Sequence, residues 1–109
     1  MGRIDIGLSD SLVLQNDEIH ALVDGKEYIF KLSEVEEMAM FTTDDGPQYC
    51  DNGLAINLGN GNVIFIWGEH PCFSKFLFEQ IGKAVTIDYE AIIEASQCFG
   101  NKMFVIYKK

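Results

Sequence analysis

The chain has 109 residues, of which 48% are hydrophobic, so it is long enough to form one domain with its own core and too apolar to be disordered. Its 17 acidic and 8 basic residues give a formal net charge of −9. A negative field of this size repels phosphate backbones and anionic lipid headgroups, which disfavours nucleic acid and membrane surfaces as partners. We expect a single domain over residues 1–109.

Apolar runs and cysteine usage bear on the compartment. The longest apolar run, Val63–Trp67, is far shorter than the about 20 residues that span a bilayer. Residues 1–11 contain no apolar run that is typical of an export signal. The three cysteines, Cys50, Cys72 and Cys98, are odd in number and lack framework spacing, which favours free thiols in a reducing compartment. These features predict a cytoplasmic protein.

The first elements in chain order are predicted to form a meander. Ser11–Gln15 has strand character, and Glu18–Val23 alternates apolar with more polar residues, as a half-buried strand does. Asp24 and Gly25 then predict a two-residue hairpin turn, because a type I′ turn needs a positive φ at both positions. Lys26–Leu32, rich in residues that favour strands, is the predicted returning strand.

The stretch Ser33–Thr43 has two interpretations. Ser33 followed by Glu36 matches a helix capping box, and the Glu, Met and Ala residues of this stretch favour a helix. The same residues equally suit a strand that begins after a single turn. We predict a short turn over Ser33–Glu36 that leads into a strand over Glu37–Thr43.

A loop and a second hairpin are predicted next. Asp44–Gly53 concentrates Gly, Pro, Asp and Asn, each of which favours turns, and therefore predicts a loop. Leu54–Leu58 and Asn62–Trp67 follow as paired strands that Gly59-Asn60-Gly61 connects. The unbroken apolar run over Val63–Trp67 indicates a strand that is buried on both sides.

The apolar period then changes from that of a strand to that of a helix. Pro71 suits a first helical position, and Gly82 is placed to end the helix. Between them, the apolar residues that recur at helical spacing and are predicted to face inward are Phe73, Phe76, Leu77 and Ile81. We predict a helix over Pro71–Ile81.

A second helix and a last strand complete the chain. The helix is predicted over Asp88–Phe99, with Asp88 as its cap and Gly100 at its end. Its predicted inward stripe consists of Tyr89, Ile92, Ile93 and Ser96. Lys102–Tyr107 is the predicted last strand, and the sequence leaves open whether it pairs within the chain or with another chain. Strands followed by helices predict an α+β fold.

From about residue 19 to residue 81, this order of elements resembles a bacterial pleckstrin-homology-like (PH-like) domain. The resemblance rests on the meander, the segment KLSEVEEMAMF, the hairpin GLAINLGNGNVIFIW and the helix FSKFLFEQI. It implies a strongly bent antiparallel sheet capped by an amphipathic helix, which an extra C-terminal helix and strand follow here. Members that bind phosphoinositides carry Lys and Arg in the first loop, whereas residues 15–18 are Gln, Asn, Asp and Glu, so lipid-headgroup binding is not implied.

Few residues suggest a reactive or metal-binding site. The candidate soft ligands are His70, Cys72, Cys50 and Cys98, with His20 in reserve, and they lack the close pairing of zinc sites such as Cys-x₂-Cys. His70 and Cys72 are two residues apart at a helix start, which is a poor geometry for a nucleophile and its base. The acidic loop lacks the ligand pattern of an EF-hand. We expect no metal, no cofactor and no catalytic residue, and so a protein that is not an enzyme.

The acidic residues are concentrated in one half of the chain. Residues 1–51 carry 3 basic and 12 acidic side chains, whereas residues 52–109 carry 5 of each. Six carboxylates follow one another with no basic residue between them, namely Glu34, Glu36, Glu37, Asp44, Asp45 and Asp51. They are the candidate binding surface, although a solvated face that keeps the protein in solution explains the same pattern.

Together these features predict a small binding domain whose acidic surface meets a basic protein by electrostatic steering and a modest apolar anchor. An inhibitor or immunity-type protein fits this size and charge. The alternative is a domain that binds a small molecule or lipid in a pocket between sheet and helix. The oligomeric state does not follow from the sequence.

Overall fold

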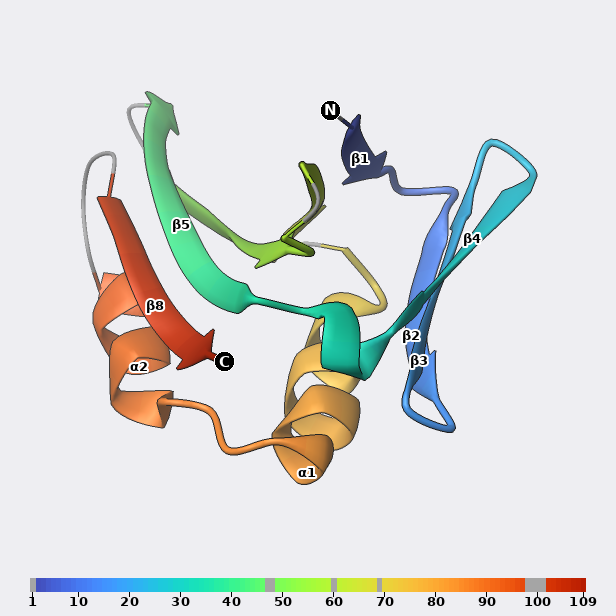
Figure 1. Cartoon of the computed structure of the whole chain (residues 1–109). Coiled ribbons are helices and arrows are strands. Elements are labelled where there is room, and N and C mark those ends of the chain that lie inside the picture. Colours follow the sequence, from blue (N-terminus) through green and yellow to red (C-terminus); the bar gives the residue numbers. More distant parts are fainter. Residues whose placement is uncertain (1, 47–48, 60, 69, 98–101) are drawn as a thin grey trace.

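The computed structural model of the chain describes residues 2–46, 49–59, 61–68, 70–97 and 102–109 (Figure 1). Side chains are described in these ranges except at residues 43–51, 96 and 97. The features predicted at Asn60, Cys98, Phe99 and Gly100 lie outside the described residues.

Eight strands of the described chain form two sheets. The five-stranded sheet has the order β1 (Gly2–Ile6), β7 (Asn62–Trp67), β6 (Tyr49–Asn57), β5 (Glu37–Gly46) and β8 (Lys102–Lys108). The three-stranded sheet has the order β2 (Ser11–Gln15), β3 (Glu18–Val23) and β4 (Lys26–Lys31). β1 pairs with β7 in parallel, and the other pairings are antiparallel. The predicted α+β class is confirmed, but the strands are divided between two sheets and one pairing is parallel.

Helices cover one side of these sheets. The 3₁₀ turn η1 (Leu32–Glu34) joins β4 to β5. The π-helix η2 (Lys75–Ile81) continues into the single α-helical turn α1 (Gly82–Ala84) and contacts β2. The helix α2 (Tyr89–Gln97) lies against β5, β6 and β8, as Figure 1 shows.

The core lies between the five-stranded sheet, the helices and the meander. Alternate residues of the sheet, including Met38, Leu54 and Ile64, share one buried cluster with Phe76 and Ile19 from the other two layers. This alternation follows from the strand geometry, in which successive side chains point to opposite faces. The four residues predicted to face inward from the first helix, Phe73, Phe76, Leu77 and Ile81, are all buried.

Several predicted elements agree with the structure. The predicted bounds of β2 and β3 are those observed, and Asp24 and Gly25 have φ angles of 52° and 80° as the type I′ turn requires. A turn precedes β5, as predicted, so the stretch after Ser33 forms a strand. β6 pairs with β7 through Leu54 and Ile66, and β8 pairs with β5 within the chain.

The predicted loop over Asp44–Gly53 is wrong, because β5 continues to Gly46 and β6 begins at Tyr49. Pairing across the two strands persists at Thr43 and Asp51, and the register shifts between Thr43 and Gly46. Such an irregularity accommodates residues that favour turns without ending the ladder. The local composition therefore predicted a loop, whereas pairing between β5 and β6 keeps most of this stretch in strands.

The ends of the first helix also differ from the prediction. Pro71 lies in a turn, and helical structure runs from Phe73 to Ala84. Gly82 has φ −62° and lies inside the helix instead of ending it. A Cβ atom at Gly82 would lie 2.6 Å from the hydroxyl oxygen of Tyr89, so glycine here makes room for a side chain from the neighbouring helix.

The predicted inward stripe of the second helix is wrong at two positions. Ile92 is buried, but Tyr89 and Ile93 are exposed, and Ser96 has no described side chain. The buried face instead includes Ala91 and Ala95, whose small side chains let α2 approach the sheet closely. Asp88 does cap the helix, since its Oδ1 accepts a hydrogen bond from the Ala91 amide at 3.1 Å.

Two features of the sheet were not anticipated. β1 adds a parallel strand at the edge of the sheet, next to β7. The strand β7 is buried on one face only, because Ile64 and Ile66 are buried whereas Trp67 is exposed. The prediction that this strand is buried on both sides is therefore wrong, and the outward face of the sheet becomes a candidate for function.

Candidate functional site

The outward face of the five-stranded sheet carries an apolar centre with polar and charged residues at its margins. Directly paired residues point to the same side of a sheet, so the pairing register identifies the members of this face. From β1 to β8, its central row is Asp5, Phe65, Ala55, Ala39 and Val105. One flanking row is Trp67, Gly53, Phe41 and Met103, and the other is Arg3, Val63, Asn57, Glu37 and Lys108. We call these residues the open sheet face.

Exposure shows that this face is solvent-accessible. Met103 is 63% exposed, and Trp67 and Val105 are exposed as well. α2 contacts the same strands, but its buried residues Ala95 and Ile92 belong to the core on the opposite side. The strands are apolar on both faces of the sheet, and the described helices cover only one of these faces.

An aromatic cluster forms one end of the open sheet face. The ring of Phe41 lies 5.1 Å from that of Trp67 and 5.8 Å from that of Phe65, edge-on in both pairs. Gly53 makes this arrangement possible, since a Cβ atom there would lie 2.6 Å from Cζ of Phe41. Edge-to-face packing adds to the apolar contact and fixes the orientation of the rings.

A hollow lies next to this cluster. Its floor is formed by Ala39 and Ala55, which are paired across β5 and β6, and its volume is about 270 Å³. Glu37, Asn57, Val63, Phe65 and Met103 complete its lining. Small residues between larger ones create this depression.

The charges on the open sheet face are balanced. The guanidinium carbon of Arg3 lies 4.4 Å above the ring of Phe65, and its Nε is 3.0 Å from Oδ1 of Asp5. At the other side of the face, Glu37 is paired across the strands with Lys108. The acidic character of the chain therefore arises elsewhere.

The structure brings only some of the six predicted acidic residues together. Glu34, Glu36 and Glu37 lie around the start of β5, and the first two are exposed. Asp44 and Asp45 belong to the far end of β5, and Asp51 pairs with Thr43 there. Asp44 is seven strand positions beyond Glu37, or roughly 23 Å away. The side chains of Asp44, Asp45 and Asp51 lie outside the described set.

Basic residues lie close to the first of these two groups. The Nζ of Lys109 donates a hydrogen bond to the carbonyl oxygen of Ser33 at 2.7 Å, and its backbone amide donates one to the backbone carbonyl oxygen of Glu36 at 2.9 Å. No local sequence pattern indicates this contact, because 76 positions separate Lys109 from Ser33. The start of β5 is consequently a mixed-charge region.

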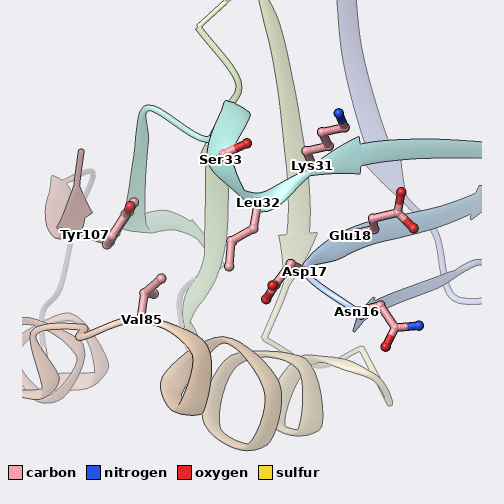
Figure 2. A pocket seen from close by; sticks show the side chains of 8 residues that line it. All are labelled: Asn16, Asp17, Glu18, Lys31, Leu32, Ser33, Val85 and Tyr107. Carbon is pink, nitrogen blue, oxygen red and sulfur yellow. The ribbon is translucent and has the colours of Figure 1, made fainter.

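A second hollow, between the meander and the helices, has a volume of about 550 Å³ (Figure 2). It is lined by Asn16, Asp17, Glu18, Lys31, Leu32, Ser33, Val85 and Tyr107. In Figure 2, Leu32 and Val85 point toward each other across it, while the ammonium group of Lys31 points away. We call it the cleft; its inner part is apolar, and its rim carries both signs of charge.

The candidate soft ligands have structural roles where the chain is described. His70 is buried, its Nε2 lies 2.7 Å from the carbonyl oxygen of Gly7, and its Nδ1 accepts a hydrogen bond from the Cys72 amide at 2.9 Å. Cys72 is a free, partly buried thiol, whereas the side chains of Cys50 and Cys98 are not described. Within the described residues, no three His, Cys, Asp or Glu side chains are grouped to hold a metal ion.

Comparisons with known proteins identify no relative of this chain. No protein-family model, curated protein or solved structure matches this chain. The resemblance of residues 19–81 to PH-like domains stays a prediction. None of the helices in the described ranges has the length and apolar character needed to cross a membrane.

Proposed function

We propose that this chain is a protein-binding domain that uses the open sheet face as its apolar anchor. The observation that carries this proposal is the uncovered apolar surface, where Met103 and Val105 of β8 and Trp67 of the aromatic cluster are exposed. Contiguous exposed apolar surface costs free energy in water and marks interaction sites in proteins. A binding role without catalysis agrees with the expectation from the sequence.

The size of the open sheet face supports a partner of protein dimensions. Five strands about 4.8 Å apart, with three rows of outward residues about 7 Å apart, cover roughly 500 Å². Functional patches on monomers commonly measure about 300–600 Å², and a stable interface covers about 800 Å² on each side. The partner therefore contacts the rim of the sheet in addition to its apolar centre.

Charge favours a basic partner. The open sheet face itself is balanced, but the whole chain has a formal net charge of −9. Such a field accelerates the encounter with a basic protein and slows the encounter with acidic ones. The acidic residues at both ends of β5 thus act as steering groups, while the apolar face provides contact area. An inhibitor or immunity-type protein remains the kind of function that fits.

Photo-crosslinking from two similarly exposed positions tests this proposal. A benzophenone side chain at Met103 lies on the open sheet face, and one at Ile93, which is 55% exposed on α2, is the matched control. In cytosol of the native cell, we expect Met103 to give a discrete crosslinked product and Ile93 to give none. Val105→Asp on the same face should reduce this product at least tenfold. Equal crosslinking from both positions would contradict the proposal.

The cleft supports a second candidate function, the binding of a small molecule. Its volume of about 550 Å³ lies within the range of ligand sites, about 300–1,000 Å³. Leu32, Val85 and Tyr107 suit an apolar body, and Asp17 suits a polar or cationic end. This candidate follows the PH-like resemblance, in which a helix caps the bent sheet. Ligand binding that Val85→Trp abolishes and Val105→Asp leaves intact would favour it.

A further inference from the structure

The outer edge of β4 is unpaired in the described chain. β4 is the last strand in the order β2-β3-β4, and Figure 1 shows its hairpin projecting from the body of the molecule. Ile29, near the middle of the strand, is 50% exposed. An exposed edge of this length presents backbone donors and acceptors that can extend the sheet.

The hairpin turn determines which backbone groups are free. Asp24 and Gly25 form a two-residue turn, so the closing pair Val23 and Lys26 exchanges hydrogen bonds across β3 and β4. Hydrogen-bonded pairs alternate with non-bonded pairs along an antiparallel ladder. The amides and carbonyls of Glu27 and Ile29 and the amide of Lys31 are therefore directed outward and free, whereas the carbonyl of Lys31 begins the 3₁₀ turn η1.

Glu27, Ile29 and Lys31 of one copy are complementary to the same three residues of a second copy. If a second β4 pairs antiparallel about a two-fold axis at Ile29, Ile29 faces Ile29, and Glu27 of each copy faces Lys31 of the other. Ile29 then exchanges two hydrogen bonds with Ile29 of the other copy, and each Glu27 carbonyl accepts one from the amide of the opposite Lys31. Both ion pairs form on one face, and on the other face Tyr28 lies opposite Phe30 twice, which is a favourable aromatic pair.

We propose that two copies of this chain associate through β4 in this register, forming a continuous six-stranded antiparallel sheet. An isologous contact of this kind needs one self-complementary surface, and β4 provides it. The open sheet face belongs to the other sheet, so this inference is independent of the proposed function. The dimer would carry two open sheet faces.

Other registers lack this complementarity. If the two-fold axis lies between Tyr28 and Ile29, Lys26 of one copy faces Lys31 of the other. Residues whose backbone groups point outward, such as Ile29, then face residues whose groups point toward β3, such as Tyr28, so no hydrogen bonds form. An axis at Tyr28 or at Phe30 restores the backbone pairing but leaves Glu27 and Lys31 opposite uncharged residues. The register centred on Ile29 is thus the one that satisfies hydrogen bonds and charges together. Like charges directly opposite each other destabilise a strand pair, whereas opposite charges stabilise it.

A charge-swap experiment tests the interface. Sedimentation equilibrium would compare the wild type, Glu27→Lys, Lys31→Glu, the double variant and a 1:1 mixture of the two single variants. Because a short edge contact is smaller than a standard interface, the range of about 10 µM to 1 mM is needed. We expect each single variant to weaken self-association about tenfold, and the double variant to restore it.

The mixture is the decisive sample. A Glu27→Lys chain presents two lysines at these positions and a Lys31→Glu chain presents two glutamates, so the mixed pair should associate as tightly as the wild type. Changes within one chain, such as the loss of the 3.6 Å contact between Glu27 and His20, cannot be restored by mixing. Circular dichroism would establish that each variant is folded.

Val105→Asp is the control on the other sheet, and its self-association should equal that of the wild type. A wild type that stays monomeric over the whole range would overturn the proposal. So would single variants that associate as the wild type does, or a mixture that stays monomeric while the wild type dimerises.

Discussion

At the scale of single residues, His70 connects segments that are distant in the sequence. Its Nδ1 accepts the amide of Cys72, so this nitrogen carries no proton and Nε2 is the donor to the carbonyl oxygens of Gly7 and Asp10, at 2.7 Å and 3.1 Å. The ring thereby joins the turn before the first helix to the loop between β1 and β2. The sequence predicted only a helix-start residue at this position, because a contact 63 residues away leaves no periodic signal.

Replacing His70 by Ala should destabilise the fold by about 2–4 kcal/mol, since it leaves buried backbone groups without their partner and opens a small cavity. Urea unfolding followed by the fluorescence of Trp67 measures this change. His20→Ala is the matched control, because the His20 ring lies 3.6 Å and 3.7 Å from partly exposed carboxylates, and this change should cost less than about 1 kcal/mol. Equal effects of the two substitutions would show that the His70 hydrogen bonds contribute little.

At the scale of elements, the two helices differ in how clearly the sequence marks their buried faces. In the first helix, Phe73, Phe76, Leu77 and Ile81 recur at helical spacing, and Phe78 is the one large apolar residue off this stripe. In α2, adjacent isoleucines and intervening alanines permit several faces. The face with Ala91 and Ala95 is the buried one because α2 packs against β8, and this packing is a tertiary effect that the helix sequence alone does not show.

The buried face of the first helix can be tested with two phenylalanines. Phe76 is fully buried, whereas Phe78 is 40% exposed and stacks on Tyr89 with a ring separation of 6.4 Å. Phe76→Ala should lower the free energy of unfolding by about 3–5 kcal/mol, because it removes a large core side chain. Phe78→Ala should cost about 1 kcal/mol or less in the same denaturant titration. The reverse order would place the wrong face of this helix in the core.

At the scale of the whole molecule, sequence patterns predict local elements better than their arrangement. The hairpins and the α+β class follow from period and turn residues. The parallel pairing of β1 with β7 joins Ile4 to Ile64, and no local rule indicates it. The open sheet face likewise depends on which helix covers which side of the sheet. Counting charges in the sequence identified six acidic residues. Only the structure shows that β5 divides them into two groups, one at each of its ends.

The net charge leads to a last prediction, on stability and salt. Among the described residues, the pair of Arg3 and Asp5 is the one ion pair that does not involve histidine, so most of the carboxylates behind the net charge of −9 repel one another. The molecule extends over 37 × 30 × 27 Å, which compares with a Debye length of about 30 Å at 0.01 M salt and about 8 Å at 0.15 M. Raising NaCl between these values should therefore stabilise the fold by about 1 kcal/mol, or roughly 4–8 °C in the unfolding midpoint. Sodium chloride is used instead of a sulfate salt, because sulfate also stabilises the fold by strengthening apolar burial, independently of charge screening.

The variant Asp44→Asn, Asp45→Asn, Asp51→Asn changes the formal charge from −9 to −6 and provides the control for this effect. Its midpoint at low salt should equal or exceed that of the wild type, because removing like charges relieves repulsion. Its further rise with NaCl should be smaller, because less repulsion remains to be screened. Differential scanning calorimetry at both salt concentrations gives all four midpoints. A wild-type midpoint that falls as NaCl is added would mean that favourable ion pairs outweigh self-repulsion, and the steering field assigned to the acidic residues would lose its physical basis.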